Sequence, residues 1–500
     1  MTIRRNRPGL RTLAAAAALL ALPWLQGCTT NPATGRDNLT FVSQEEERRL
    51  GEEAHPEILQ QFGGEYQDAA TQAYVRSIGQ LLAKSSEMPD LDWHFTVIDS
   101  DIINAFALPG GYIYISRGLM ALADNEAQLA SVIGHEIGHV TARHYATRHS
   151  QAVGAQIGVA LLSILTGVAA GGEAAQSVGQ LSSVLAQGYL ASYSRSQELE
   201  SDSLGIRYLS RTGYDTGASA EFLAKMEASK NLLAELRNEA PRGYSYLDTH
   251  PPSAERVREA TAQIRRPPPA GAGHARELFL SKLDGMVYGD SPSQGLRKGR
   301  VFAHPEMMFR FEVPEGFYML NFPSQVVATG PDDAALAFTG DSEGWQGDMR
   351  SYLTRKWAPK ANLQNVEAIT VDGRPGATGW TRGRTNSGIV DVRLVAVRWT
   401  NGQIYRFQFV APQRIMQRYE RQFRETTYSL RALSRAEAAR LEPYRIRIHT
   451  VRSGETFETL ARRTPFDRLA ADHLRVLNGY GPGEQPRAGD SIKLVVEGRR

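Results

Sequence analysis

The residues with the clearest chemistry are two histidines and a glutamate in one predicted helix. The helix starts at Asn125, where Asn-Glu-Ala-Gln is a typical helix start, and it contains His135, Glu136 and His139. At about 100° per residue, the two histidines lie about 40° apart, one turn above each other and away from the apolar side of the helix. Such a pair suits a tetrahedral zinc ion, and the neighbouring Glu136 suits a general base. The spacing therefore predicts a metal site.

Other residues of this helix lead to further expectations. Gly134 and Gly138 each cost roughly 1 kcal/mol in a helix, so their presence predicts that another backbone packs closely there. In a continuous helix, His144 falls on the side opposite His135, and His149 lies farther along. Neither can then reach the same ion, and we expect both to be ordinary polar or capping residues. A third ligand must come from another segment.

A second predicted helix offers carboxylates for that role. It starts with Ser-Arg-Ser-Gln at residues 194–197 and ends at Gly213. Glu198 and Asp202 then lie one turn apart on one face, so one can bind zinc while the other reaches a ligand histidine or the catalytic site. Glu200 points away from this pair, and we expect it to be solvated.

Three motifs follow one another along this part of the chain. They are Asn-Ala-Phe-Ala-Leu-Pro-Gly-Gly at 104–111, His-Glu-Ile-Gly-His at 135–139 and Ser-Arg-Ser-Gln-Glu-Leu-Glu-Ser-Asp at 194–202. Through these motifs, residues 40–265 resemble the peptidase family of the CAAX prenyl endopeptidase, and most of all its soluble bacterial members of the BepA and LoiP type. The resemblance implies a gluzincin fold and one zinc ion as cofactor.

The resemblance also implies roles for individual residues. His135, His139 and Glu198 would be the zinc ligands, and Glu136 would be the general base. The residue that matches Asp202 is described in the family as a proton donor. Its position four residues after a ligand glutamate favours a role in orienting a ligand histidine instead.

Three more features of this region have two interpretations each. His250, in Thr-His-Pro-Pro, matches a family histidine that can occupy the fourth zinc position and silence the enzyme, or it is an ordinary loop residue. Arg256 either faces the substrate carbonyl group or, as we favour, is a charge on a helix surface. The predicted strand with Tyr112, Ile113 and Tyr114 resembles the edge strand on which gluzincins align an extended peptide, with a plain sheet edge as the alternative.

Residues 1–27 are typical of a lipoprotein signal peptide. Basic residues precede an apolar stretch at 12–24, which is too short to span a membrane, and Leu-Gln-Gly-Cys at 25–28 resembles a lipobox. The resemblance implies an acylated Cys28 that anchors the chain in a membrane, and Thr29 after it implies the outer membrane of proteobacteria. We therefore predict a lipid-anchored periplasmic protein. An uncleaved anchor or a chance Gly-Cys is the alternative.

The amino-acid composition indicates which kinds of molecule the protein can bind. The chain has 57 basic and 54 acidic residues, but four arginines lie within residues 1–27, so 53 − 54 leaves a net charge of −1 for the remainder. A nearly neutral chain gives no support for nucleic-acid binding, and we predict no such partner. With 42% hydrophobic residues the chain is globular, and its single cysteine excludes an internal disulfide.

The sequence predicts a multidomain α+β chain. Residues 28–265 would form the zinc peptidase domain, which is mainly helical with a small sheet, and the Pro- and Gly-rich residues 266–274 would form a linker. Alternating apolar residues predict an α+β domain of unknown role at 275–433. It would contain a hairpin at Asn401-Gly402 and a helix at 413–428 that covers one face of a sheet.

Two further segments are recognisable by composition or resemblance. Residues 153–190 are rich in Ala, Gly, Leu and Ile, and they form either a helical pair packed on the core, which we favour, or a lid over the cleft. Residues 448–496 resemble a LysM module with βααβ order. Such modules bind N-acetylglucosamine chains, which implies peptidoglycan as a partner, although a purely structural role is the alternative.

Together these features predict a zinc-dependent endopeptidase of the bacterial cell envelope. Its substrates would be unfolded or misassembled envelope proteins, because a strand that aligns peptides recognises extended backbone rather than sequence. One alternative is a chaperone-like scaffold whose zinc stays capped by His250. The other is a cell-wall hydrolase, which the LysM-like segment suggests.

Overall fold

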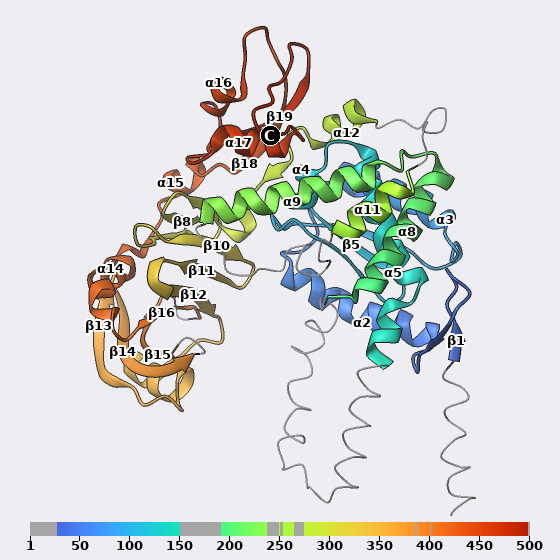
Figure 1. The fold of residues 1–500 in the computed structure, drawn as a ribbon. Coiled ribbons are helices and arrows are strands. Elements are labelled where there is room, and N and C mark those ends of the chain that lie inside the picture. Colours follow the sequence, from blue (N-terminus) through green and yellow to red (C-terminus); the bar gives the residue numbers. More distant parts are fainter. Residues whose placement is uncertain are drawn as a thin grey trace, which may run out of the picture.

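The computed structural model describes residues 28–150, 192–237, 250, 254–264, 275–385, 388–400 and 402–498. The predicted signal peptide at 1–27, the segment at 153–190 and the predicted linker at 266–274 lie outside these residues. The described residues form a helical part around a small sheet, a β-rich part beside it, and a C-terminal unit above both (Figure 1). Among the helices in these ranges, none is both long enough and apolar enough to cross a membrane.

The helical part contains the predicted metal-binding helices. Its elements are β1 (Cys28–Thr30), β2 (Asp37–Leu39), α2 (Gln44–Gln61), α3 (Ala69–Lys84), β3 (His94–Ile98), β4 (Ala105–Leu108), β5 (Tyr112–Ser116), α4 (Arg117–Leu122), α5 (Glu126–Thr141), α8 (Arg195–Thr212), α9 (Ala218–Arg237) and α11 (Ala254–Ala262). The predicted start of α5 is confirmed, since the Asn125 side chain accepts a hydrogen bond from the backbone N–H of Gln128. The start of α8 at Ser194 is also confirmed, by a complete capping box with Gln197.

Helices α5 and α8 pack with their backbones in close contact, as the two glycines predict. A Cβ added to Gly134 would lie 3.3 Å from the Cα of Gly205, and one added to Gly138 would lie 2.7 Å from the Ser201 hydroxyl oxygen. That hydroxyl donates a 2.5 Å hydrogen bond to the carbonyl oxygen of His135. Because Gly134, Gly138 and Gly205 have no side chains, the two helices approach closely. This close approach brings the histidines of α5 and the carboxylates of α8 together.

The small sheet has the strand order β3-β5-β4, with β5 in the centre. Strand β5 pairs in parallel with β3 and antiparallel with β4. The prediction that Tyr112, Ile113 and Tyr114 form an edge strand is therefore wrong. The chain reverses direction at Gly110 and Gly111, whose φ angles are 81° and 95°, so that β4 folds back onto β5 and takes the outer position itself.

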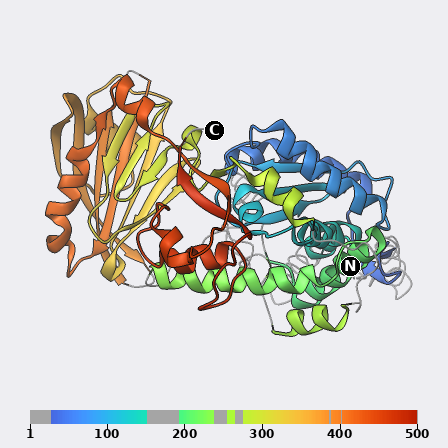
Figure 2. The same ribbon diagram turned by 90° about the horizontal axis from the view of Figure 1, so that it is seen from above.

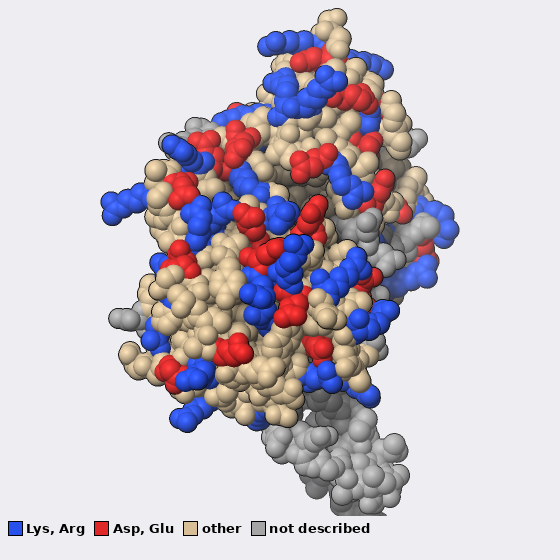
Figure 3. Space-filling view, turned by 90° about the vertical axis from the view of Figure 1, so that its left-hand side faces the viewer, with Lys and Arg blue, Asp and Glu red and all other residues tan. Residues whose placement is uncertain are grey.

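The β-rich part is an α+β unit, as the alternating pattern predicts. Helix α12 (Arg276–Leu283) leads into β6 (Val287–Tyr288), β7 (Leu296–Lys298), β8 (Val301–His304), β9 (Phe309–Glu312), β10 (Tyr318–Phe322), β11 (Gln325–Thr329), β12 (Ala335–Asp341), β13 (Gln364–Val371), β14 (Arg374–Thr385), β15 (Gly388–Arg398), β16 (Ile404–Pro412), α14 (Met416–Ser429) and β17 (Arg431–Ala432). A seven-stranded sheet, β10-β11-β12-β16-β15-β14-β13, faces a four-stranded one, β17-β9-β8-β7. The predicted hairpin is confirmed by the antiparallel pair β15–β16. Acidic and basic side chains are interspersed over the face shown in Figure 3.

The C-terminal unit has the predicted βααβ order. It comprises β18 (Tyr444–Thr450), α16 (Phe457–Ala461), α17 (Ala470–Leu477) and β19 (Ser491–Glu497), and β18 pairs antiparallel with β19. The unit is joined closely to the rest of the molecule, because β18 also pairs with β6 and α17 packs against α9 (Figure 2). Ile446 of β18 belongs to the apolar core of the helical part.

A buried lysine strengthens this junction. The ammonium group of Lys493 donates hydrogen bonds to the carbonyl oxygens of Ala121, Leu122 and Ala123, at 2.9, 3.2 and 2.6 Å, and to a carboxylate oxygen of Asp124 at 3.2 Å. These carbonyls end α4 and lie directly before the Asn125 cap of α5. One side chain of the C-terminal strand therefore satisfies the backbone at the end of α4, directly before the metal-binding helix.

Replacing Lys493 with methionine should lower the free energy of unfolding by about 3–5 kcal/mol, because the buried carbonyls lose their donor and Asp124 loses one of its two lysine partners, keeping Lys225. Urea unfolding, followed by circular dichroism of the helices and by tyrosine fluorescence, measures this loss. The same replacement at the exposed Lys84 serves as the control. Equal stability of the two variants would contradict a structural role for the Lys493 contacts.

Candidate metal centre

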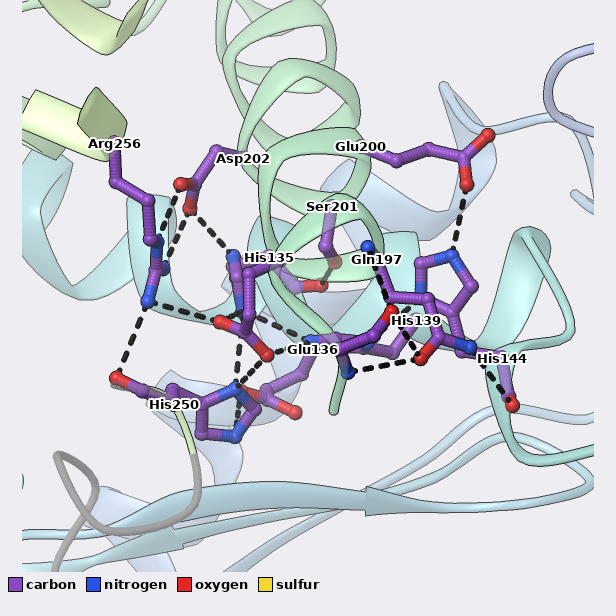
Figure 4. Close-up of polar contacts among 12 residues, drawn as sticks. His135, Glu136, His139, His144, Gln197, Glu200, Ser201, Asp202, His250 and Arg256 are labelled. Atoms are coloured by element: carbon purple, nitrogen blue, oxygen red, sulfur yellow. Dashed lines mark hydrogen bonds and ion pairs between the residues drawn. The ribbon is translucent and has the colours of Figure 1, made fainter. Parts of the chain in front are cut away.

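Four side chains converge between α5, α8 and residue 250. One ligand atom from each of His135, His139, Glu198 and His250 lies within 4.8 Å of all the others (Figure 4). The Nε2 atoms of His135 and His139 are 2.9 Å apart, and the Nδ1 atom of His250 is 2.9 Å from a carboxylate oxygen of Glu198. All four side chains are buried, each with 4% or less of its surface exposed. The structure thus brings the three predicted ligands and the predicted fourth ligand into one cluster.

The cluster has the composition and size of a site for one zinc ion. Two ligand atoms at about 2.1 Å from a tetrahedral ion lie roughly 3.4 Å apart, close to the spacing found here. Imidazole nitrogens and a carboxylate oxygen are ordinary zinc ligands. Glu136 lies beside them, fully buried, and neither of its oxygens accepts a hydrogen bond within the part of the chain that the structure describes. A buried carboxylate in this state is consistent with a site that receives an ion and a further polar group.

Asp202 contacts the ligand histidine rather than the centre of the cluster. One of its oxygens lies 2.8 Å from Nδ1 of His135, on the side of the ring opposite the cluster. Its two oxygens also accept hydrogen bonds from Nε and Nη2 of Arg256, at 2.7 and 2.8 Å. Although burial opposes it, these hydrogen bonds hold the pKa of Asp202 below its usual range. The residue is therefore an ionised acceptor for His135.

Arg256 does not lie on a helix surface, and this prediction is wrong. Only 1% of its surface is exposed, and its Nη1 atom is 2.9 Å from Glu198 and donates a 3.2 Å hydrogen bond to the carbonyl oxygen of His250. Helix α11 packs against α8 and α9, so that Arg256 is turned inward. A short helix with several charged residues gives no indication of which charge is buried, and sequence periodicity therefore missed it.

As predicted, His144 does not belong to the ligand cluster, but it is not an ordinary polar residue, and Glu200 is not simply solvated. His144 is buried, and its Nδ1 atom lies 2.8 Å from Nδ1 of His139, while its Nε2 atom lies 3.0 Å from a Glu200 oxygen. The prediction assumed one continuous helix, but α5 ends at Thr141 and Arg143 has a left-handed φ of 55°. The chain turns there and becomes helical again from residue 144, which directs His144 back toward His139.

His149 and the end of β4 lie beside this arrangement. His149 is exposed, and its ring centroid lies 5.9 Å from that of Tyr145. A small cavity of about 20 Å³ next to His139 is lined by Tyr145, Tyr193 and the end of β4, from Ala107 to Gly110, among others. Tyr193 stacks on the His139 ring at a centroid distance of 4.0 Å. The outer strand β4 therefore reaches the metal-binding cluster.

Burial and charge set different ionisation states for the two central carboxylates. Complete burial raises the pKa of Glu136. The pKa of Glu198 lies well below its ordinary value, because the attraction of His250 and hydrogen bonds from His135 and His139 outweigh the effect of burial. Glu198 is thus suited to be an anionic ligand, and Glu136 is suited to accept a proton.

Comparison with known proteins agrees with this geometry. Residues 69–264 match the family described as peptidase family M48. The chain is 28% identical over 245 residues to the mitochondrial metalloendopeptidase OMA1 of Schizosaccharomyces pombe, a match that covers 47% of this chain and 67% of the yeast protein. It is 34% identical over 216 residues to the beta-barrel assembly-enhancing protease of Escherichia coli, covering 42% of each chain. The human OMA1 metalloendopeptidase is 28% identical over 236 residues, covering 45% of this chain and 44% of the human protein.

The matched region contains His135, His139, Glu198 and His250, which come together in the structure. The chain spans less than half the length of the bacterial relative, and the family match ends at residue 264, before the β-rich part and the C-terminal unit. Metallopeptidases of this family use zinc, and the buried cluster is able to hold one such ion. The similarity of residues 69–264 to peptidase family M48, together with the buried cluster, therefore supports a metalloendopeptidase.

Proposed function

We propose that this protein is a zinc-dependent endopeptidase of the bacterial cell envelope that hydrolyses unfolded or misassembled proteins. The observation that carries the proposal is the buried cluster of His135, His139 and Glu198, with the buried Glu136 carboxylate beside it, which accepts no hydrogen bond from the described residues. The match of residues 69–264 to a family of metallopeptidases supports it.

Each residue of the cluster has a distinct part in this mechanism. His135, His139 and Glu198 hold the ion. When bound, zinc polarises the scissile carbonyl group and lowers the pKa of a water molecule to about 7. Glu136 takes the proton from the attacking water on its carboxylate and later transfers it to the nitrogen of the leaving amine. Its raised pKa favours the first of these transfers.

We assign Asp202 a positioning role instead of that of a proton donor. Its carboxylate accepts the hydrogen of His135 Nδ1, which leaves the lone pair of Nε2 for the metal. Arg256 in turn holds Asp202 through two hydrogen bonds, so the carboxylate cannot turn toward a substrate without breaking both.

We further propose that β4 aligns the substrate. It is one of the two outer strands of the sheet, it packs against α5, and its end and the turn that follows line the cavity beside His139. An extended peptide can add to such an edge through backbone hydrogen bonds, which select unfolded chains and not a particular sequence. This role replaces the one predicted for Tyr112, Ile113 and Tyr114.

His250 defines the resting state in this proposal. Its Nδ1 atom lies 2.9 Å from Glu198 and 3.3 Å from Nε2 of His135, so it occupies the position that a substrate or water would need. As a fourth ligand it would keep the enzyme latent as long as its ring stays in this position. This arrangement is also the observation that favours the second candidate, a scaffold with a permanently capped metal.

The proposed location rests on the two ends of the chain. Acylation of Cys28 after removal of residues 1–27 would anchor the protein to the membrane, and by the sorting rule for Thr29 to the outer membrane. The βααβ order of residues 444–497 supports a LysM-like module that contacts peptidoglycan. The name of the Escherichia coli relative, a beta-barrel assembly-enhancing protease, supports misassembled envelope proteins as substrates.

Digestion of unfolded casein by protein that lacks residues 1–28 tests the proposal. Activity should disappear when a chelator removes the metal and return with one equivalent of zinc, because the ion is needed for the chemistry. The His250→Ala variant should be at least as active as the unchanged protein, since it lacks the fourth ligand. If both proteins stay inert with zinc bound, the scaffold is the better description, and release of fragments from isolated cell walls would favour a cell-wall hydrolase.

A further inference from the structure

We propose that His144 and Glu200 are positioning residues that fix the orientation and tautomer of the metal ligand His139. This inference rests on the proposed function. It assigns a role in the metal site to two residues that are not themselves metal ligands.

The three side chains form a continuous row that leads away from the cluster. Nε2 of His139 faces the cluster, and its Nδ1 lies 2.8 Å from Nδ1 of His144. On the other side of the His144 ring, Nε2 lies 3.0 Å from a carboxylate oxygen of Glu200. His139 and His144 are both buried, at 2% exposure each, and Glu200 is half-buried.

This row allows only one placement of hydrogens when His139 binds a metal. An ionised Glu200 accepts a hydrogen bond, so Nε2 of His144 must carry the hydrogen. In a neutral ring, Nδ1 of His144 is then an acceptor, and Nδ1 of His139 must donate to it. The remaining lone pair of His139 is on Nε2, directed at the ion. The carboxylate therefore sets the tautomer of the ligand through the intervening ring.

The two ligand histidines thus have separate supports of the same kind. Asp202 contacts Nδ1 of His135 directly, and Glu200 acts on Nδ1 of His139 through His144. Both carboxylates belong to α8, two residues apart, and both histidines belong to α5. Packing also holds the row in place, because the Tyr193 ring stacks on His139 at 4.0 Å and lies 5.9 Å from His144.

Zinc affinity, measured by competition with a chromophoric chelator, tests this role on the protein that lacks residues 1–28. His144→Phe keeps a ring of similar size but cannot accept a hydrogen bond, and it should bind zinc about 10–100-fold more weakly. Glu200→Ala leaves His144 in place and should cost less, about 3–10-fold. His149→Phe, the same change at the exposed histidine of the same segment, should leave affinity unchanged.

Rescue by a conservative variant separates hydrogen bonding from simple packing. The side-chain oxygen of asparagine can lie near the position of Nδ1 of His144, so His144→Asn should recover most of the affinity. The absorption bands of the cobalt(II)-loaded protein should change in His144→Phe and remain close to the original in His144→Asn. Thermal unfolding of the metal-free proteins shows whether each variant folds. If His144→Phe does not fold, the zinc affinity of Glu200→Ala still tests the proposed role.

Two results would overturn the inference. One is equal zinc affinity in His144→Phe and His149→Phe. The other is a His144→Asn variant as weak as His144→Phe, which would mean that ring packing alone matters. Neither result bears on the proposed function, which fails instead if the unchanged protein binds no zinc or cleaves nothing with zinc bound.

Discussion

Peptide hydrolysis should fall by about 10²–10⁴-fold when Glu136 is replaced with glutamine, while zinc binding stays the same. Glutamine has the same shape as glutamate but cannot accept a proton from water at neutral pH. Glu136 is fully buried, none of the described residues forms a hydrogen bond with its carboxylate, and its ion-pair contact with His250 Nε2 is long, at 3.6 Å, so the change removes the base without breaking an internal hydrogen bond.

The rate of casein cleavage measures the expected loss of activity, and the zinc content of the purified variant measures whether metal binding is unchanged. Glu57→Gln on the exposed side of α2 is the matched control, with both properties unchanged. Both proteins should also carry the His250→Ala substitution. Otherwise His250, as a fourth ligand, could suppress cleavage in both and hide the difference in their rates. Comparable turnover by Glu136→Gln would mean that another group activates the water.

Replacing Glu198 with alanine should abolish stoichiometric zinc binding. Glu198 is the only cluster member from α8, and its carboxylate lies 3.5 Å from the Nε2 atoms of both His135 and His139. Without it, the remaining protein ligands are neutral imidazoles, and the buried Arg256 loses one of its partners. The positive charge of Arg256 would then oppose the entry of a cation.

Elemental analysis after dialysis against a defined zinc concentration gives the metal content. Glu235→Ala, on an exposed position of α9, should retain one zinc ion per chain. Glu198→Gln, which keeps the size of the side chain, covers the case in which the alanine variant unfolds. One tightly bound zinc ion in both Glu198 variants would show that this carboxylate is not a ligand.

The local features of the metal-binding helices could be predicted from sequence because their causes are local. Asn125 and the pair Ser194 and Gln197 satisfy free backbone N–H groups at helix starts, and such contacts depend on neighbours three residues away. The i, i+4 spacing of His135 and His139 likewise follows from helix geometry alone. These parts of the site needed no knowledge of tertiary structure.

The features that sequence reasoning missed depend on chain reversals and packing. The left-handed turn at Arg143 changes the direction of the chain, and no residue type there predicts it, since arginine rarely adopts a positive φ. The position of β5 in the centre of its sheet depends on the fold-back of β4. The burial of Arg256 depends on how α11 packs. A histidine five residues after His139 was visible in the sequence, but its direction was not.

The contacts of Lys493 also bear on the order in which this chain can fold. A ribosome makes the protein from its N-terminus, so the carbonyls at residues 121–123 are completed long before their donor, which follows up to 372 positions later. Contacts between such distant positions form late, because a long loop must first be closed. We therefore expect the end of α4, directly before the metal-binding helix, to reach its final stability only after residue 493 has been synthesised. A nascent or prematurely terminated chain would then lack a fully formed proteolytic centre, which limits the opportunity for cleavage before the protein is complete.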